Sequence, residues 1–252
     1  MRVFLFFFLI ITSCTPSILE FQTAKTLGKD KQETTPLVYF SAPEIIQEII
    51  RNTQGETDII DETCDKCKGS FNVGIKHAYG IMHDVDVSVR AEFSGLYYGA
   101  GIGMKTRLIK NTLALHVPFY LTSDLSMIIE PIVRGSSPEI EILKMNITPS
   151  LLYTYRWGYY RKYTNTIAIK YIREEYINEG KFDVENLTNS GPLHSFGVTH
   201  GWSLEQPKWS IRPEIGVFYG SIFKSNWLHM QAGIGFSRRY ANRKNQFDAW
   251  FF

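Results

Sequence analysis

The chain has 252 residues and a formal net charge of +2, with Lys+Arg 27 against Asp+Glu 25. A charge so close to balance excludes strong electrostatic attraction to nucleic acid. Aromatic residues make up 14% of the chain, which is high for an ordinary soluble domain. After the N-terminus no stretch approaches the ~18 consecutive apolar residues that a membrane-spanning helix needs.

The first residues are typical of an export signal. Arg2 supplies a positive charge, and residues 3–11 form a short apolar core. At about 1.5 Å per residue this core covers well under half of a ~30 Å hydrocarbon layer, so it favours a cleaved leader over a spanning helix. We therefore predict a signal peptide over residues 1–13, with Cys14 as the first mature residue. The alternative is a plain signal peptide followed by an incidental cysteine.

Residues 11–14, ITSC, resemble the lipobox of bacterial lipoproteins. In that family a lipid is attached to the cysteine sulfur, and cleavage before the cysteine frees an N-terminus that is then acylated. The resemblance implies that Cys14 carries lipid, including palmitate-type acyl chains. At about 0.8 kcal/mol per buried CH₂, several such chains would anchor the mature chain durably.

Residues 14–35 are mostly polar and are predicted to be a tether. Within them, residues 22–29 (QTAKTLGK) resemble the opening of a family of small bacterial outer-membrane β-barrel lipoproteins, where a QTA(R/K)TLGKG-like stretch leads into the first strand. The family's second glycine is Asp30 in this chain. The resemblance implies an outer-membrane barrel, but it implies no defined molecular activity.

A first strand is predicted at 37–41 and is followed by a long excursion over residues 42–69. In PEIIQEII the apolar positions 45, 46, 49 and 50 predict a short amphipathic helix over 43–50. The excursion also contains Cys64 and Cys67, which we interpret as a local disulfide. Metal binding and redox chemistry are the alternatives: zinc would need two further ligands, and a redox motif would need a strand before it and a helix after it.

From residue 71 the apolar residues alternate with polar or small ones, which is the period of a β-strand. The clearest alternation lies at 71–79, 84–93, 96–108, 113–121, 145–157, 209–219 and 228–236, with weaker strands at 126–134, 164–172, 193–204 and 246–252. Pro149 and Pro213 cannot donate to a ladder and predict bulges or strand ends. Together with the strand at 37–41, these runs predict an all-β antiparallel barrel over residues 36–252. We expect about twelve strands, with ten as the alternative.

Four features favour a transmembrane barrel with its apolar face outward over a periplasmic, lipocalin-like barrel. The runs have the length of a tilted membrane crossing, and aromatic residues gather near strand ends. The polar face carries small residues and charges, with Asp86–Arg90 and Arg212–Glu214 as expected pairs. Phe252 resembles the terminal signal of outer-membrane barrels. The predicted luminal charge network comprises Asp84, Asp86, Arg90, Glu92, Lys105, Arg107, Arg212 and Glu214.

No catalytic residue is assigned from the sequence. His200 and Ser203 are three residues apart, which in a strand places them on opposite faces and spoils a nucleophile–base contact. The glycines at 99, 101 and 103 lie on one face of a strand, where they leave room for bulky luminal side chains. No metal ligand set and no cofactor are predicted.

The sequence thus predicts a lipid-anchored barrel of the bacterial outer membrane with a non-enzymatic role, either structural or as a narrow pore. The alternatives are a barrel enzyme that modifies envelope lipids and a lipid-tethered periplasmic binding barrel. The expected partners are outer-membrane lipids and the outer-membrane assembly machinery, with no nucleic acid. Neither an oligomeric state nor a ligand is predicted.

Overall fold

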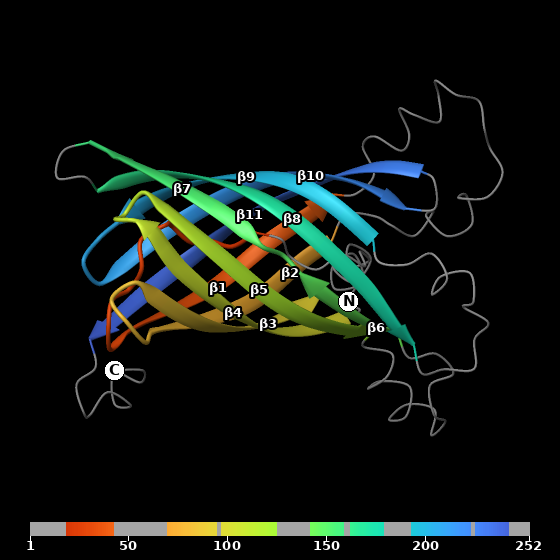
Figure 1. Ribbon diagram of the computed structural model, residues 1–252, viewed down its shortest axis with the longest axis horizontal. Helices are drawn as coiled ribbons and strands as arrows, with labels where there is room; N and C mark the ends of the chain where they lie inside the picture. The colour runs from red at the N-terminus through yellow and green to blue at the C-terminus, as the bar shows by residue number, and fades with distance from the viewer. Residues whose placement is uncertain are drawn as a thin grey trace, which may run out of the picture.

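The computed structural model describes residues 19–42, 70–94, 97–124, 142–158, 162–178, 193–222 and 225–241. The regular structure in these ranges is one antiparallel β-sheet. Its first strand pairs with both the second and the last, so the sheet closes into a barrel whose strands run obliquely to its axis (Figure 1). The strands are β1 (Lys31–Ala42), β2 (Ser70–Gly80), β3 (Val85–Ser94), β4 (Tyr97–Ile109), β5 (Leu113–Asp124), β6 (Ile142–Ile147), β7 (Ser150–Trp157), β8 (Tyr163–Asn178), β9 (Leu193–Glu205), β10 (Trp209–Ile222) and β11 (Ser225–Ala241). Nowhere in these ranges is there a helix with the length and apolar character needed to cross a membrane.

The barrel has ten strand positions, which is the lower of the two predicted numbers. β6 and β7 are two parts of one position, because both pair with β5 and with β8. They separate at Thr148 and Pro149, where Pro149 lacks the N–H that a continuous ladder requires. The predicted strands 126–134 and 246–252 lie outside the described residues, as does the predicted helix over 43–50, and the barrel closes without them.

Pro213 lies inside β10, and the strand continues through it. On the β11 side it faces Ile234 in regular register. On the β9 side the paired residues step from Ile211 directly to Glu214, so the ladder is interrupted at the proline. The predicted irregularity is therefore present, on the side where proline has no N–H to donate.

The apolar residues of the strands face outward and the polar ones face the lumen. Along β3, Val87 and Val89 are exposed whereas Asp86 and Arg90 are buried. The same alternation holds along β7, β8 and β10. This is the arrangement of a transmembrane barrel and the reverse of a lipocalin, which buries its apolar face.

The outward face gives a direct test of this orientation. Val89 is at the middle of β3 and is 55% exposed. Val89→Arg should destabilise the barrel in a bilayer by about 2–4 kcal/mol, because a cation at mid-membrane depth loses its hydration. Urea unfolding in phospholipid vesicles measures this. Ile109→Arg, at the end of β4, is the matched control, with an expected cost of about 0–1 kcal/mol. Equal costs at the two positions would contradict the orientation.

Candidate functional site in the barrel lumen

Residues 19–28, here called the luminal segment, lie inside the barrel ahead of β1. Leu19, Glu20 and Phe21 are almost completely buried. The segment contacts side chains from strands all around the barrel, namely Lys76 of β2, Asp86 and Arg90 of β3, Lys105 of β4, His116 of β5, Thr154 of β7, Lys170 of β8, and Arg212 and Glu214 of β10. The stretch predicted to be a tether therefore differs in the structure: its middle part fills the lumen, and its last residues, from Lys31, begin β1.

Wall side chains satisfy the backbone of the luminal segment. The N–H of Phe21 donates to Glu214 Oε2 at 2.6 Å, and the N–H of Leu27 donates to both oxygens of Asp86 at 3.0 and 3.1 Å. The N–H of Ala24 donates to Thr154 Oγ1 at 2.8 Å. These bonds matter because buried backbone groups need hydrogen-bond partners.

The segment's carbonyl groups are bound by cations of the wall. Arg90 donates to the carbonyl of Leu19, Arg212 Nη1 donates to that of Phe21 at 3.1 Å, and Lys105 Nζ donates to that of Lys25 at 2.8 Å. Hydrogen bonds with a charged partner are stronger than neutral ones. Side chains of the wall therefore bind the backbone of the segment from Leu19 to Leu27.

Phe21 fits against the wall because two glycines of β11 leave room for it. A Cβ built on Gly233 would lie 2.8 Å from Phe21 Cζ, and one built on Gly235 would lie 2.9 Å from Phe21 Cβ. Phe21 packs in one buried cluster with Leu19, Leu37 and Tyr39. Part of the first strand's luminal face is therefore apolar, and it is covered by the segment.

The segment enters the lumen at the end where β2 and β3 are joined by residues 81–84. There the N–H of Asp30 donates to the carbonyl of Gly80 at 2.8 Å. Gly28 has a φ of +85°, a conformation that glycine adopts without strain. A Cβ on Gly80 would lie only 2.0 Å from the Gly28 oxygen, so this approach requires glycine. The turn fixes the segment's direction into the barrel.

The carboxylate of Glu20 lies among three buried basic side chains of the wall, here called the basic triad: Lys76, His116 and Lys170. Glu20 Oε2 is 3.2 Å from His116 Nδ1 and 3.5 Å from Lys76 Nζ. Glu20 Oε1 is 3.7 Å from Lys170 Nζ. Gln22 of the segment also donates to Oε2, at 3.3 Å. A negative charge supplied by the segment thus lies between a lysine of β2 and a lysine of β8, beside a histidine of β5.

A second cluster, the Arg–Glu cluster, consists of Glu33, Glu205, Arg212 and Arg239. Arg212 Nη1 is 2.6 Å from Glu33 Oε1, and Arg239 Nε is 2.8 Å from Glu33 Oε2. Glu205 completes the cluster, 3.3 Å from Arg212 and 2.7 Å from Arg239. The four side chains link β1, β9, β10 and β11 and include both strands of the closing seam.

In the structure, the charged residues of the predicted network form different ion pairs from those expected from the sequence. Asp86 binds Lys105 at 3.2 Å rather than Arg90, and Arg90 pairs with Glu92. Residues four apart on one strand are separated by about 13 Å. Asp86 and Lys105, by contrast, lie directly opposite each other on neighbouring strands.

The remaining members of that network lie at different depths. Arg212 belongs to the Arg–Glu cluster, whereas Glu214 binds the luminal segment. Asp84 and Arg107 pair with each other at an exposed turn, so they lie at the rim of the barrel and not inside it.

Four residues for which the sequence predicts a role lie outside the described residues: Cys14, Cys64, Cys67 and Phe252. His200 and Ser203 lie on opposite faces as predicted, because Ser203 is buried beside the Thr164 hydroxyl and His200 packs on Trp202. Within the described ranges no group of three His, Cys, Asp or Glu residues is placed to hold a metal ion.

The luminal glycines of β4 have the predicted structural role. A Cβ on Gly101 would lie 2.1 Å from the Tyr120 ring, and one on Gly103 would lie 2.8 Å from His116 Nε2. The glycines therefore let these two large luminal side chains approach β4. Their role is spatial, and this confirms the interpretation of the alternating glycines.

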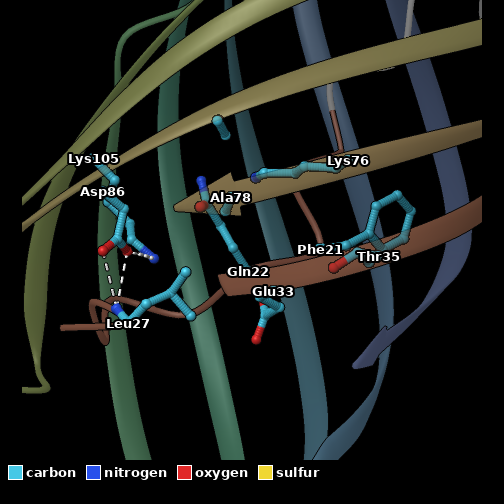
Figure 2. Close-up of a pocket in the computed structure, with 10 residues that line it drawn as sticks. Phe21, Gln22, Leu27, Glu33, Thr35, Lys76, Ala78, Asp86 and Lys105 are labelled. Atoms are coloured by element: carbon cyan, nitrogen blue, oxygen red, sulfur yellow. Dashed lines mark hydrogen bonds and ion pairs between the residues drawn. The ribbon is translucent and has the colours of Figure 1, made fainter. Parts of the chain in front are cut away.

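The space between the luminal segment and the wall is small. A cavity of about 10 Å³ is lined by Phe21, Gln22, Leu27, Glu33, Thr35, Lys76, Ala78, Asp86, Ser88 and Lys105. Figure 2 shows these side chains within the ring of strands, with Leu27 bound to Asp86. A volume of this size has room for roughly one water molecule. At this place the segment and the wall leave no room for a solute larger than water.

Comparison with solved structures finds outer membrane proteins at low similarity. An outer membrane channel from Pseudomonas putida F1 is 8% identical, with a TM-score of 0.41, and the match covers 90% of this chain and 100% of that one. Neisserial surface protein A is 8% identical at a TM-score of 0.37, covering 84% and 96% of the two chains. OprG from Pseudomonas aeruginosa is 7% identical at a TM-score of 0.35, covering 88% and 100%. Neither a protein-family model nor a curated relative matches the sequence. We therefore assign the site from contacts within this chain.

Proposed function

We propose that the protein is a lipid-anchored β-barrel of the bacterial outer membrane with a non-enzymatic role, and that the luminal segment closes its pore in the resting state. The observation that carries this proposal is the position of the luminal segment: residues 19–27 contact strands on several sides of the wall, and the cavity beside Phe21 and Leu27 has a volume of about 10 Å³. A barrel of this size is already narrow, and a segment bound by charged side chains closes it further.

The apolar outer face supports residence in a membrane, and the connections support an orientation. Transmembrane barrels have short periplasmic turns and longer extracellular loops. At one end every connection is short: residues 81–84, 110–112, 158–162 and 206–208. The other end holds the three long connections, 43–69, 125–141 and 179–192, together with the two-residue connections 95–96 and 223–224. In this proposal the end with only short connections faces the periplasm, and the luminal segment enters from that side. Phe252 would be read by the assembly machinery.

In this proposal the protein is attached to the membrane by lipid on Cys14 and by the barrel itself. Cys14→Ser removes only the lipid. We expect incorporation of radiolabelled palmitate to be lost, because the acceptor sulfur is absent. Most of the protein should remain in the outer-membrane fraction, because the apolar face of the barrel still holds it there. Fractionation on a sucrose gradient, together with heat-shift electrophoresis, measures both results.

One control variant accompanies Cys14→Ser, and two results would contradict the proposal. Cys64→Ser should keep the palmitate label, since that residue lies outside the lipobox. Release of the Cys14→Ser protein into the soluble fraction, with no heat-shifted band, would contradict the embedded barrel. Retained label would contradict lipidation at Cys14.

A further inference from the structure

We infer that the basic triad is a binding site for small carboxylate solutes, and that Glu20 occupies it as an internal ligand while the barrel is closed. This inference rests on the proposed closed state and names the ligand class of the same lumen. Glu20 presents a carboxylate to Lys76, His116 and Lys170, each of which is at least nine-tenths buried. The three bases come from strands that are not adjacent in the barrel, so they converge on one point of the lumen.

The nearby acidic side chains of the wall have other partners. Asp86 binds Lys105 and the backbone of Leu27, and Glu92 binds Arg90 and the Tyr39 hydroxyl. Glu214 accepts from the backbone N–H of Phe21. The carboxylate at the triad is therefore supplied by the segment and not by the barrel. Buried cations need a compensating anion, so a site vacated by Glu20 favours an anion from solution.

The geometry selects a carboxylate that is small. The triad contacts both oxygens of Glu20, with Lys170 at Oε1 and with His116 and Lys76 at Oε2. Two-sided binding of this kind matches a planar carboxylate better than a spherical ion such as chloride. While the segment stays in the lumen, a carboxylate that takes the place of the Glu20 side chain lies among buried residues, so the rest of such a ligand must be short.

Chemical rescue in the full-length chain tests the site. Glu20→Ala removes the side chain beyond Cβ, and the missing atoms correspond to acetate. We expect this variant to have a lower heat-shift midpoint than the wild type in detergent. Sodium acetate should recover most of the loss in a saturable way, whereas sodium chloride at equal ionic strength and neutral acetamide should not. The wild type should not respond to acetate, because Glu20 fills the site.

Two further variants make the result specific. Thr23→Ala alters a buried side chain of the same segment without removing charge, so it should show no acetate response. Adding Lys76→Gln or His116→Gln to Glu20→Ala should abolish the rescue, and having two choices guards against one that fails to fold. Equal midpoints for Glu20→Ala in acetate and in chloride would overturn the inference. That result would leave the closed barrel standing, since closure is measured separately by conductance of the wild type.

Discussion

Replacing Glu20 by lysine should convert a closed barrel into a conducting one. The substitution places an ammonium group against Lys76 and Lys170, beside His116, in a buried site where like charges repel strongly. The segment should then leave the lumen, because its central contact has changed sign. In planar lipid bilayers we expect no steady conductance from the wild type and discrete, single-channel steps from Glu20→Lys.

Gln22→Lys is the matched control for this experiment. It introduces the same lysine side chain two residues away, with a charge change of +1 where Glu20→Lys gives +2, and there the side chain lies beside the Glu20 carboxylate, to which Gln22 already donates. This variant should stay closed. Wild-type channels as conductive as Glu20→Lys would contradict the closed resting state. A silent Glu20→Lys variant with an unchanged heat-shift midpoint would show that the triad does not hold the segment in place.

The second large effect is expected in the Arg–Glu cluster. Glu33→Ala leaves Arg212 and Arg239 facing Glu205 alone. Removing one partner of a buried ion pair costs about 3–5 kcal/mol, because the remaining charge stays buried without compensation. We expect that loss in the free energy of unfolding, measured by urea titration of the barrel in phospholipid vesicles.

An exposed ion pair gives the comparison. Asp84 pairs with Arg107 at the rim, and its side chain is 54% exposed. Asp84→Asn should therefore cost only about 0–1 kcal/mol. If Glu33→Ala cost no more than Asp84→Asn, the Arg–Glu cluster would not stabilise the barrel seam.

β2, β3 and β4 could be predicted from the sequence to within one residue at each end, whereas β5, β10 and β11 extend three to five residues beyond the predicted bounds. β3 was expected at 84–93 and runs from Val85 to Ser94, because its outward valines and inward charges separate cleanly. β1 was expected only at 37–41, yet it runs from Lys31 to Ala42. Its luminal face carries Leu37 and Tyr39, which pack on the luminal segment and obscure the period.

The candidate site was harder to predict, because its parts are distant in sequence. Lys76 lies within the predicted strand 71–79, but nothing in the neighbouring sequence indicates Glu20 as its partner. Glu20 lies in a stretch whose polar composition is typical of a tether. The flanking Leu19 and Phe21 were the available signal, since two large apolar residues in a solvated tether are costly to expose. The strands that Leu19 and Phe21 contact are set by how the sheet closes into a barrel. A local sequence pattern carries no information on that closure.

The position of Phe21 bears on how the barrel assembles. It packs against Tyr39 of β1 and against the glycines of β11, so it lies behind the seam between the first and last strands. That seam joins residues as far apart in sequence as Lys31 and Ala241, and pairings of such separation form late in folding. The luminal segment leads directly into β1, so it must already lie inside the barrel when β1 pairs with β11. Folding rate, and not only the finished pore, should therefore depend on these ten residues.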